Sequence, residues 1–191
     1  MDLYFVRHGE TDWQQLEERG VRGWARSFAP LTGMGRLQME AIARDARLQG
    51  ADAILTSSYA RALESAARLN QLLNKPLYVE YDLHEWLPQK DPLADLDEAS
   101  AMLAGEELRS ARHAPPPEER SWESLEEVRR RALQVFGRYA QFPSLIVMSH
   151  AVLIASVTGL RRPIAHAEIV PYKLDLQAPG PPPPGRKLAR Q

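Results

Sequence analysis

The chain has 191 residues, 44% of them hydrophobic and 26% charged, and a net charge of −1 at pH 7. This size and composition are typical of a single globular domain, and the near-zero charge argues against nucleic acid or a membrane as a partner. The absence of cysteine excludes disulfide bonds, thiolate metal sites and a cysteine nucleophile. The first residues lack the basic start and long apolar stretch of a signal peptide, so we expect a cytoplasmic protein.

The amino-terminal half alternates between short apolar runs and helical patterns. In chain order, we expect a buried strand at 3–6, a helix at about 35–48, a strand at 51–56, a helix at 59–73 and a strand at 77–81. Gly50 is a suitable stop for the first helix, and Ser57-Ser58 is a start signal for the second. Pro76 ends the second helix because proline cannot continue the helical hydrogen bonds.

The carboxyl-terminal half repeats this alternation after an irregular stretch. In chain order, we expect a cap at about 86–120 with a short helix near 95–111, a helix at 121–140, a strand at 144–148, a helix at 151–158 and a strand at 169–176. Pro171 predicts that this last strand lies at a sheet edge. The proline-rich and then basic segment 178–191 cannot form a core, and we expect a disordered tail after a domain at 1–177.

Strands that alternate with helices predict an α/β fold. Parallel strands joined by crossover helices have both faces of their sheet covered. We therefore expect a three-layer α/β/α sandwich with a mostly parallel central sheet.

Polar residues gather where the expected strands end. In open α/β sheets, ligands bind beyond the carboxyl ends of the strands. The residues at those ends are Arg7-His8-Gly9-Glu10-Thr11 after the first strand, Ser57-Ser58 and Arg61 after the second, His84-Glu85 after the third, and Ser149-His150 after the fourth. The arginines Arg7 and Arg61, the histidines His8 and His150 and the carboxylate of Glu85 are thus expected along one edge of the sheet.

Such a set of side chains suits phosphoryl transfer. The planar guanidinium groups of Arg7 and Arg61, with a protonated His150, could clamp phosphate oxygens. His8 could attack phosphorus as a neutral imidazole, and Glu85 could donate a proton to the leaving oxygen and later accept one from water. Arg7 and His8 can share a ligand only if the strand ends between them, and Gly9 permits that turn.

The Arg7–Thr11 segment resembles the signature of the histidine phosphatase superfamily, in its phosphoglycerate mutase-like branch. Further matches follow in the expected order: Leu31-Thr32-Gly33-Met34-Gly35 with Gln38, then Ser57-Ser58 with Arg61-Ala62, then Leu83-His84-Glu85, and then Ser149-His150. The resemblance covers about residues 2–176. It implies a phosphoglycerate mutase-like α/β/α fold and a phosphatase that works through a phosphohistidine.

The resemblance also implies individual roles. His8 would be phosphorylated, Arg7, Arg61 and His150 would bind phosphate, and Glu85 would be the general acid and base, with no metal or other cofactor. Further expected substrate-binding residues are Thr11, Gln14 and Ala151. Gln14 replaces the family's usual asparagine, and Ala151 replaces a glycine but keeps its N–H. Trp86-Leu87-Pro88 replaces the family's common glycine-tryptophan pattern, which affects the substrate pocket.

Two alternatives stay open beside a phosphatase of small phosphorylated metabolites. A phosphoglycerate mutase would use the same residues, but such mutases carry a longer insertion after the acid than the segment 86–120 offers. A non-catalytic phospho-ligand-binding protein on the same fold is the second alternative. The sequence leaves a homodimer open. We also expect His84, His113 and His166 at the surface, and Arg129-Arg130-Arg131 on a solvated helix face.

Overall fold

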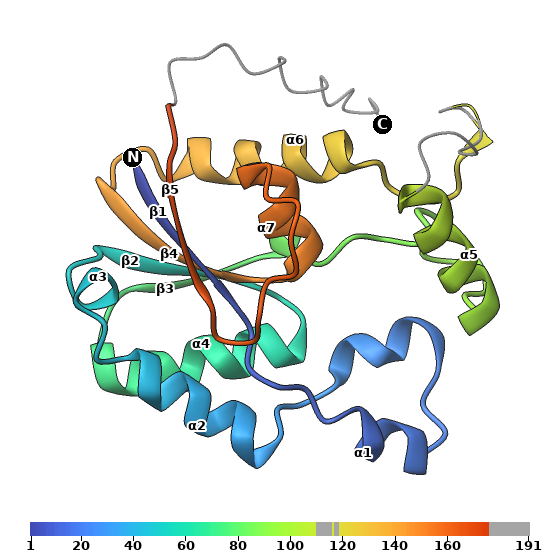
Figure 1. Ribbon diagram of the computed structural model, residues 1–191, viewed down its shortest axis with the longest axis horizontal. Coiled ribbons are helices and arrows are strands. Elements are labelled where there is room, and N and C mark those ends of the chain that lie inside the picture. The colour runs from blue at the N-terminus through green and yellow to red at the C-terminus, as the bar shows by residue number, and fades with distance from the viewer. Residues whose placement is uncertain (110–115, 117–118, 176–191) are drawn as a thin grey trace, which may run out of the picture.

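The computed structural model describes residues 1–109, 116 and 119–175, and Figure 1 shows a central sheet between two layers of helices. The strands are β1 (Asp2–Arg7), β2 (Ala53–Ser57), β3 (Leu77–Glu80), β4 (Ser144–Ser149) and β5 (Ile169–Lys173). The α-helices are α1 (Trp13–Glu18), α2 (Gly33–Ile42), α3 (Ala46–Gln49), α4 (Ala60–Leu73), α5 (Glu98–Arg109), α6 (Leu125–Arg138) and α7 (Ala151–Thr158). Two short 3₁₀ helices, η1 (Gly23–Phe28) and η2 (Tyr81–Leu83), lie between them.

The five strands form one sheet in the order β3-β2-β4-β1-β5. Every neighbouring pair is parallel except β1 and β5. This arrangement confirms the predicted α/β fold with a mostly parallel sheet. The edge position of β5 is also confirmed, and it accommodates Pro171, whose missing N–H would interrupt a central strand. Within the described part of the chain, no helix is long and apolar enough to cross a bilayer.

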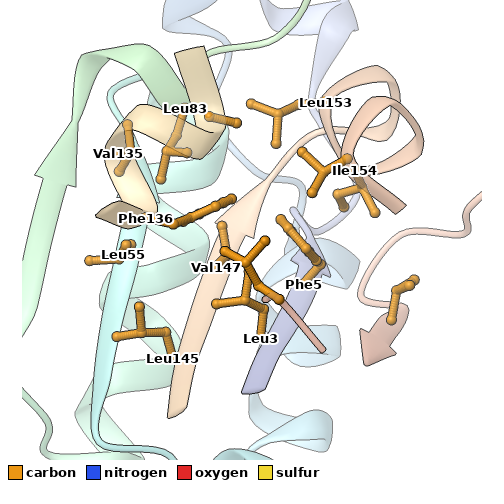
Figure 2. Close-up of a cluster of buried hydrophobic side chains, with 14 of the residues drawn as sticks. Leu3, Phe5, Leu55, Leu83, Val135, Phe136, Leu145, Val147, Leu153 and Ile154 are labelled. Carbon is orange, nitrogen blue, oxygen red and sulfur yellow. The ribbon is translucent and has the colours of Figure 1, made fainter. Parts of the chain in front are cut away.

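Two apolar clusters, one on each face, hold the helices on the sheet. On one face, Phe5 and Val147 of the strands meet Phe136 of α6 and Leu153 of α7, as Figure 2 shows. The rings of Phe5 and Phe136 make an edge contact with their centroids 5.8 Å apart. On the other face, α2 and α4 cover the strand residues that point the opposite way, such as Ile146. Both faces of the strands are apolar because both are covered.

The structure corrects two of the expected helices. The single helix at 35–48 is wrong, because the chain turns after Ile42 and Asp45 starts a second helix by accepting a hydrogen bond from the Arg47 N–H. The helix expected at 121–140 begins only at Leu125. Ser124 is its N-cap and forms a capping box with Glu127, so residues 121–124 remain outside the helix.

Other boundaries move by smaller amounts. The expected 95–111 helix is α5, and the strand expected to end at Leu176 ends at Lys173. Helix α4 begins at Ala60 after Tyr59, which makes no side-chain capping bond, rather than at the Ser57-Ser58 signal. The proposed tail 178–191 and the rest of the cap at 110–115 and 117–118 lie outside the described residues.

The loop after β1 is held by close backbone packing against the start of α2. A Cβ atom added to Gly35 would lie 2.3 Å from the Glu10 carbonyl oxygen, and one added to Gly9 would lie 2.5 Å from the Gly35 carbonyl oxygen. The Thr32 N–H donates to the Glu10 carbonyl at 3.0 Å, and the Thr32 hydroxyl donates to the Glu10 carboxylate at 2.8 Å. Residues 31–35 therefore hold the loop that follows β1.

We predict that Gly35→Ala lowers the free energy of unfolding by about 1–3 kcal/mol, because a backbone atom cannot move away from the new methyl group as a side chain could. Gly33→Ala, in the same helix, is the matched control, since no atom lies within 4 Å of the added Cβ. The control should unfold within about 1 kcal/mol of the wild type or be more stable. Chemical denaturation measures both, and equal stabilities would refute the steric argument.

Candidate active site

The parallel register of β1 and β4 brings two histidines together. Arg7 pairs with Ser149 in the sheet, so the next residues, His8 and His150, leave the two strands side by side. The His8 N–H donates to the Ser149 carbonyl at 3.0 Å, and the centroids of the two imidazole rings are 5.1 Å apart. The two predicted histidines therefore lie in one site at the carboxyl edge of the sheet.

Hydrogen bonds define the tautomer of His8. Its Nδ1 lies 2.8 Å from the Gly9 carbonyl oxygen, which can only accept, so Nδ1 carries the proton. The Arg61 Nε–H donates to His8 Nε2 at 3.2 Å, so Nε2 presents a lone pair. Burial, and then the charge of Arg61, lower the pKa of His8 to about 3. His8 is thus a neutral imidazole whose Nε2 can act as a nucleophile.

Both predicted arginines lie in the site with unused donors. The Arg7 Nη1 donates to the Ile164 carbonyl at 2.6 Å, but its buried Nε has no hydrogen-bond partner among the described residues. Within the same part of the chain, the Arg61 guanidinium makes one hydrogen bond, to His8. Burial lowers the pKa of each arginine, while the charge of Glu85 raises it. A buried cation at Arg61 and a half-buried one at Arg7, both with free N–H groups, favour an anion between them.

His150 is fully buried and also has a free ring nitrogen. Its Nε2 lies 2.9 Å from the Ser57 hydroxyl, and its Nδ1 has no partner in the described structure. Burial, and then the charge of Arg61, lower the pKa of His150 well below its usual value. The expectation of a protonated His150 is therefore not met in this environment. A neutral ring that accepts from Ser57 still carries a proton on Nδ1 for an anionic ligand.

Glu85 lies at the amino terminus of α7. Its carboxylate oxygens lie 3.4 Å from the Val152 N–H and 3.3 Å from the Leu153 N–H, both in the first turn of the helix. The Trp86 N–H also donates to it, at 2.9 Å. Glu85 influences the pKa of both Arg7 and Arg61, so the carboxylate shares their site. The sequence-based placement of an acid beside the arginines is consistent with this geometry.

An aromatic stack supports Arg61. Its guanidinium carbon lies 5.1 Å from the Tyr59 ring centroid and 5.5 Å from that of Trp13. The guanidinium of Arg26 also lies over the Trp13 ring, at 5.0 Å. Tyr59 additionally makes an edge contact with the His150 ring. Cation–π contacts of this kind orient an arginine without neutralising its charge.

The remaining predicted binding residues differ in their distance from this centre. The Thr11 hydroxyl lies 3.3 Å from His8 Nδ1, and Ala151 is the first residue of α7, directly after His150. Gln14 is exposed on α1, and its amide donates to the Glu18 carboxylate at 2.8 Å. Thr11 and Ala151 thus border the site, whereas the Gln14 side chain is engaged within its own helix.

Three residues that the sequence predicted at the surface lie near the site or are shielded from solvent. His84 is buried rather than at the surface, and it stacks on Tyr59. His166 is partly buried, with its ring 5.5 Å from that of His8. Arg131 is not on a solvated face, because it forms a buried ion pair with Glu123. Helical periodicity could have revealed Arg131, since it lies three residues after Val128 and four before Val135, both buried.

Comparisons with known proteins identify the family of the chain. The sequence profile described as histidine phosphatase superfamily (branch 1) matches residues 3–173. The chain therefore belongs to the histidine phosphatase superfamily. Its fold matches that of the Bacillus stearothermophilus protein YhfR with a TM-score of 0.69 and 21% identity, over 91% of each chain. A mycobacterial glucosyl-3-phosphoglycerate phosphatase matches with a TM-score of 0.64 and 20% identity, over 89% of this chain and 90% of that one.

The relatives found by sequence similarity are named as phosphoglycerate mutases. A probable phosphoglycerate mutase GpmB from Enterobacter sp. (strain 638) is 38% identical over 66 residues, which are 35% of this chain and 29% of that protein. The match thus spans less than a third of that relative. The GpmB from Serratia proteamaculans (strain 568) is 25% identical over 169 residues, which cover 84% of this chain and 76% of that protein.

We predict that the free energy of unfolding falls as the pH is lowered from about 6.5, the usual histidine pKa. Between that value and about 3, the unfolded chain binds a proton that folded His8 does not bind. The expected loss is about 1.4 kcal/mol per pH unit for such a histidine. Denaturation curves at pH 7.5 and pH 5 test this, and His8→Gln should show a weaker pH dependence. An equal dependence in the two proteins would contradict the assignment of a neutral, buried His8.

Proposed function

We propose that this protein is a phosphatase that hydrolyses small phosphomonoesters through a phosphohistidine at His8. The observation that carries the proposal is the neutral His8, whose Nε2 lone pair faces a buried guanidinium. Free donors of Arg7 and His150 lie in the same site. A nucleophile surrounded by fixed cationic and N–H donors is what phosphoryl transfer requires. The phosphatases among the structural neighbours support the same reaction class.

In the first step, His8 Nε2 attacks the phosphorus of the bound ester. Arg7, Arg61 and the His150 Nδ1–H donate to the phosphoryl oxygens and stabilise the charge that spreads over them. Arg61 exchanges its hydrogen bond with His8 for one with the phosphate, which frees the lone pair. The ester P–O bond breaks, and Glu85 in its protonated form donates a proton to the leaving oxygen.

In the second step, water attacks the phosphohistidine. Glu85, now ionised, accepts a proton from this water as the N–P bond breaks. Inorganic phosphate leaves, and His8 returns to the neutral tautomer held by the Gly9 carbonyl. The first turn of α7 contacts the Glu85 carboxylate and holds it in place in this half of the cycle.

A phosphoglycerate mutase is the second candidate, and the names of the sequence relatives favour it. A mutase must return the phosphoryl group to a bound acceptor instead of water. Both reactions share the phosphohistidine, so they differ in the acceptor and not in the roles of His8 or the arginines. Measuring both phosphate release and the interconversion of 3- and 2-phosphoglycerate distinguishes a phosphatase from a mutase.

We predict that the wild type releases inorganic phosphate from p-nitrophenyl phosphate or a member of a phosphometabolite panel, without added metal. His8→Ala should lose nearly all of this activity, because the substitution removes the attacking nitrogen. Acid-labile, base-stable phosphate on the wild-type protein after rapid quenching would identify the phosphohistidine. Activity that survives in His8→Ala would overturn the mechanism, and interconversion without phosphate release would favour the mutase.

Arg61→Met should lower kcat/KM by roughly 10²–10³-fold, the cost of removing one fixed donor to a charged transition state. Arg68→Met is the matched control, because Arg68 lies on the same helix but outside the site. The control should keep wild-type kinetics. Steady-state kinetics with the best panel substrate measure both, and an Arg61→Met enzyme as active as the control would remove Arg61 from the phosphate clamp.

A further inference from the structure

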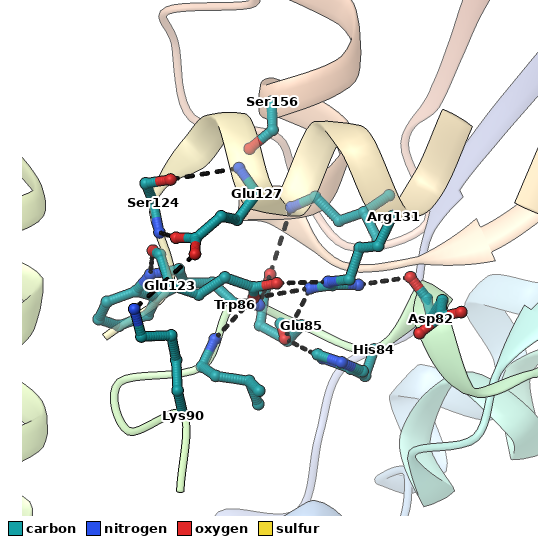
Figure 3. Close-up of polar contacts among 12 residues, drawn as sticks. Asp82, His84, Glu85, Trp86, Lys90, Glu123, Ser124, Glu127, Arg131 and Ser156 are labelled. Atoms are coloured by element: carbon teal, nitrogen blue, oxygen red, sulfur yellow. Dashed lines mark hydrogen bonds and ion pairs between the residues drawn. The ribbon is translucent and has the colours of Figure 1, made fainter. Parts of the chain in front are cut away.

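The segment that carries Glu85 is anchored by a neighbouring helix. Residues 84–87 follow η2 directly and belong to no helix or strand. Figure 3 shows Arg131 of α6 and Glu123, just before that helix, enclosing this segment. The position of the Glu85 backbone therefore depends on long-range contacts and not on regular hydrogen bonding.

Arg131 holds the segment at two carbonyl groups. Its Nη1 donates to the Asp82 carbonyl, and its Nη2 donates to the Glu85 carbonyl at 3.2 Å. The same guanidinium binds both carboxylate oxygens of Glu123, at 2.6 Å through Nε and 3.0 Å through Nη2. The ion pair is mostly buried, with side-chain exposures of 12% for Arg131 and 8% for Glu123. The fork thus fixes the backbone on both sides of His84.

Glu123 holds the other end of the same segment. Its N–H donates to the Leu87 carbonyl at 2.9 Å, and its own carbonyl accepts from the Trp86 indole. Its carboxylate also accepts from the Leu87 N–H at 3.3 Å. Together, the two residues of the ion pair contact the backbone or side chain of residues 82, 85, 86 and 87. Glu85 has little freedom to shift while both contacts persist.

We propose that Arg131, held by Glu123, is a positioning residue for the general acid and base Glu85. The inference rests on the proposed phosphatase reaction and extends it to two residues that do not touch the phosphoryl group. Arg131 sets the Glu85 backbone, and the first turn of α7 contacts its carboxylate, so the acid is held at both ends. A carboxyl group fixed in this way can meet the leaving oxygen at hydrogen-bond distance.

Only a guanidinium can make this set of contacts. A planar fork places donors from Nε, Nη1 and Nη2 in fixed directions, whereas a lysine ammonium is a single point charge. Arg131→Lys therefore retains the charge near Glu123 but loses the simultaneous hold on the two carbonyls. The double variant Glu123→Gln/Arg131→Met removes both charges together, so that neither is left buried without a partner.

The test compares two leaving groups. An alkyl phosphomonoester needs a proton on its leaving oxygen, whereas p-nitrophenolate leaves readily without one. General acid catalysis contributes about 10²–10⁴-fold, so we expect Arg131→Lys to lower kcat/KM about 10- to 100-fold for the alkyl ester and less than about 3-fold for p-nitrophenyl phosphate. The double variant should show the same selectivity, and Glu85→Gln should show it more strongly. A role in folding alone would lower kcat/KM equally for both substrates.

Arg130→Met is the matched control, since Arg130 is exposed on the same helix, and it should keep wild-type kinetics with both esters. Thermal unfolding establishes that each variant is folded at the assay temperature. An equal loss for both substrates in Arg131→Lys and the double variant would overturn the positioning role and leave the phosphatase reaction intact. A wild type that hydrolyses neither ester would overturn the proposed function and this inference with it.

Discussion

The site depends on the parallel pairing of β1 with β4. This register places Arg7 opposite Ser149, so that the residues after them, His8 and His150, leave the sheet together. Because both strands run in the same direction, their carboxyl ends meet at one edge, where the helices that follow β2 and β4 also begin. A shift of one residue in this register would turn the strand side chains to the opposite face and separate the two histidines.

The charge balance of the site follows from burial. Arg61, His8 and His150 are buried and Arg7 is half-buried, and the charge of the Glu85 carboxylate acts on both arginines. Burial lowers the pKa of both histidines and so favours their neutral forms, which limits the positive charge of the site. The arginines keep their charge and their free donors. Binding of a dianion at such a site would stabilise the folded protein, because a ligand that binds only the folded state raises the free energy of unfolding.

The site is also supported from outside. Residues 31–35 pack against the loop that holds His8, and Ser65 of α4 accepts from the Gly9 N–H at 3.0 Å. Glu85 is held from α6 by the ion pair of Arg131 and Glu123. Segments far apart in the sequence thus hold the residues of the candidate site in position. Residues 31–35 contact this loop through the backbone of Gly35 and through the N–H and hydroxyl of Thr32.

The sequence alone determined the fold class and the strand ends at which the candidate site residues lie. Apolar runs mark strands by composition, and their polar ends mark the edge where Arg7, His8, Arg61, Glu85 and His150 gather. The starts of α6 and α3 follow from local caps, the capping box of Ser124 with Glu127 and the side chain of Asp45, which the helices predicted at 121–140 and 35–48 did not take into account. Only the tertiary structure revealed the burial of His84, the surroundings that lower the pKa of His150 and the engagement of Gln14 with Glu18. Burial and pKa are properties of the surroundings in space, and those surroundings come from residues distant in the chain.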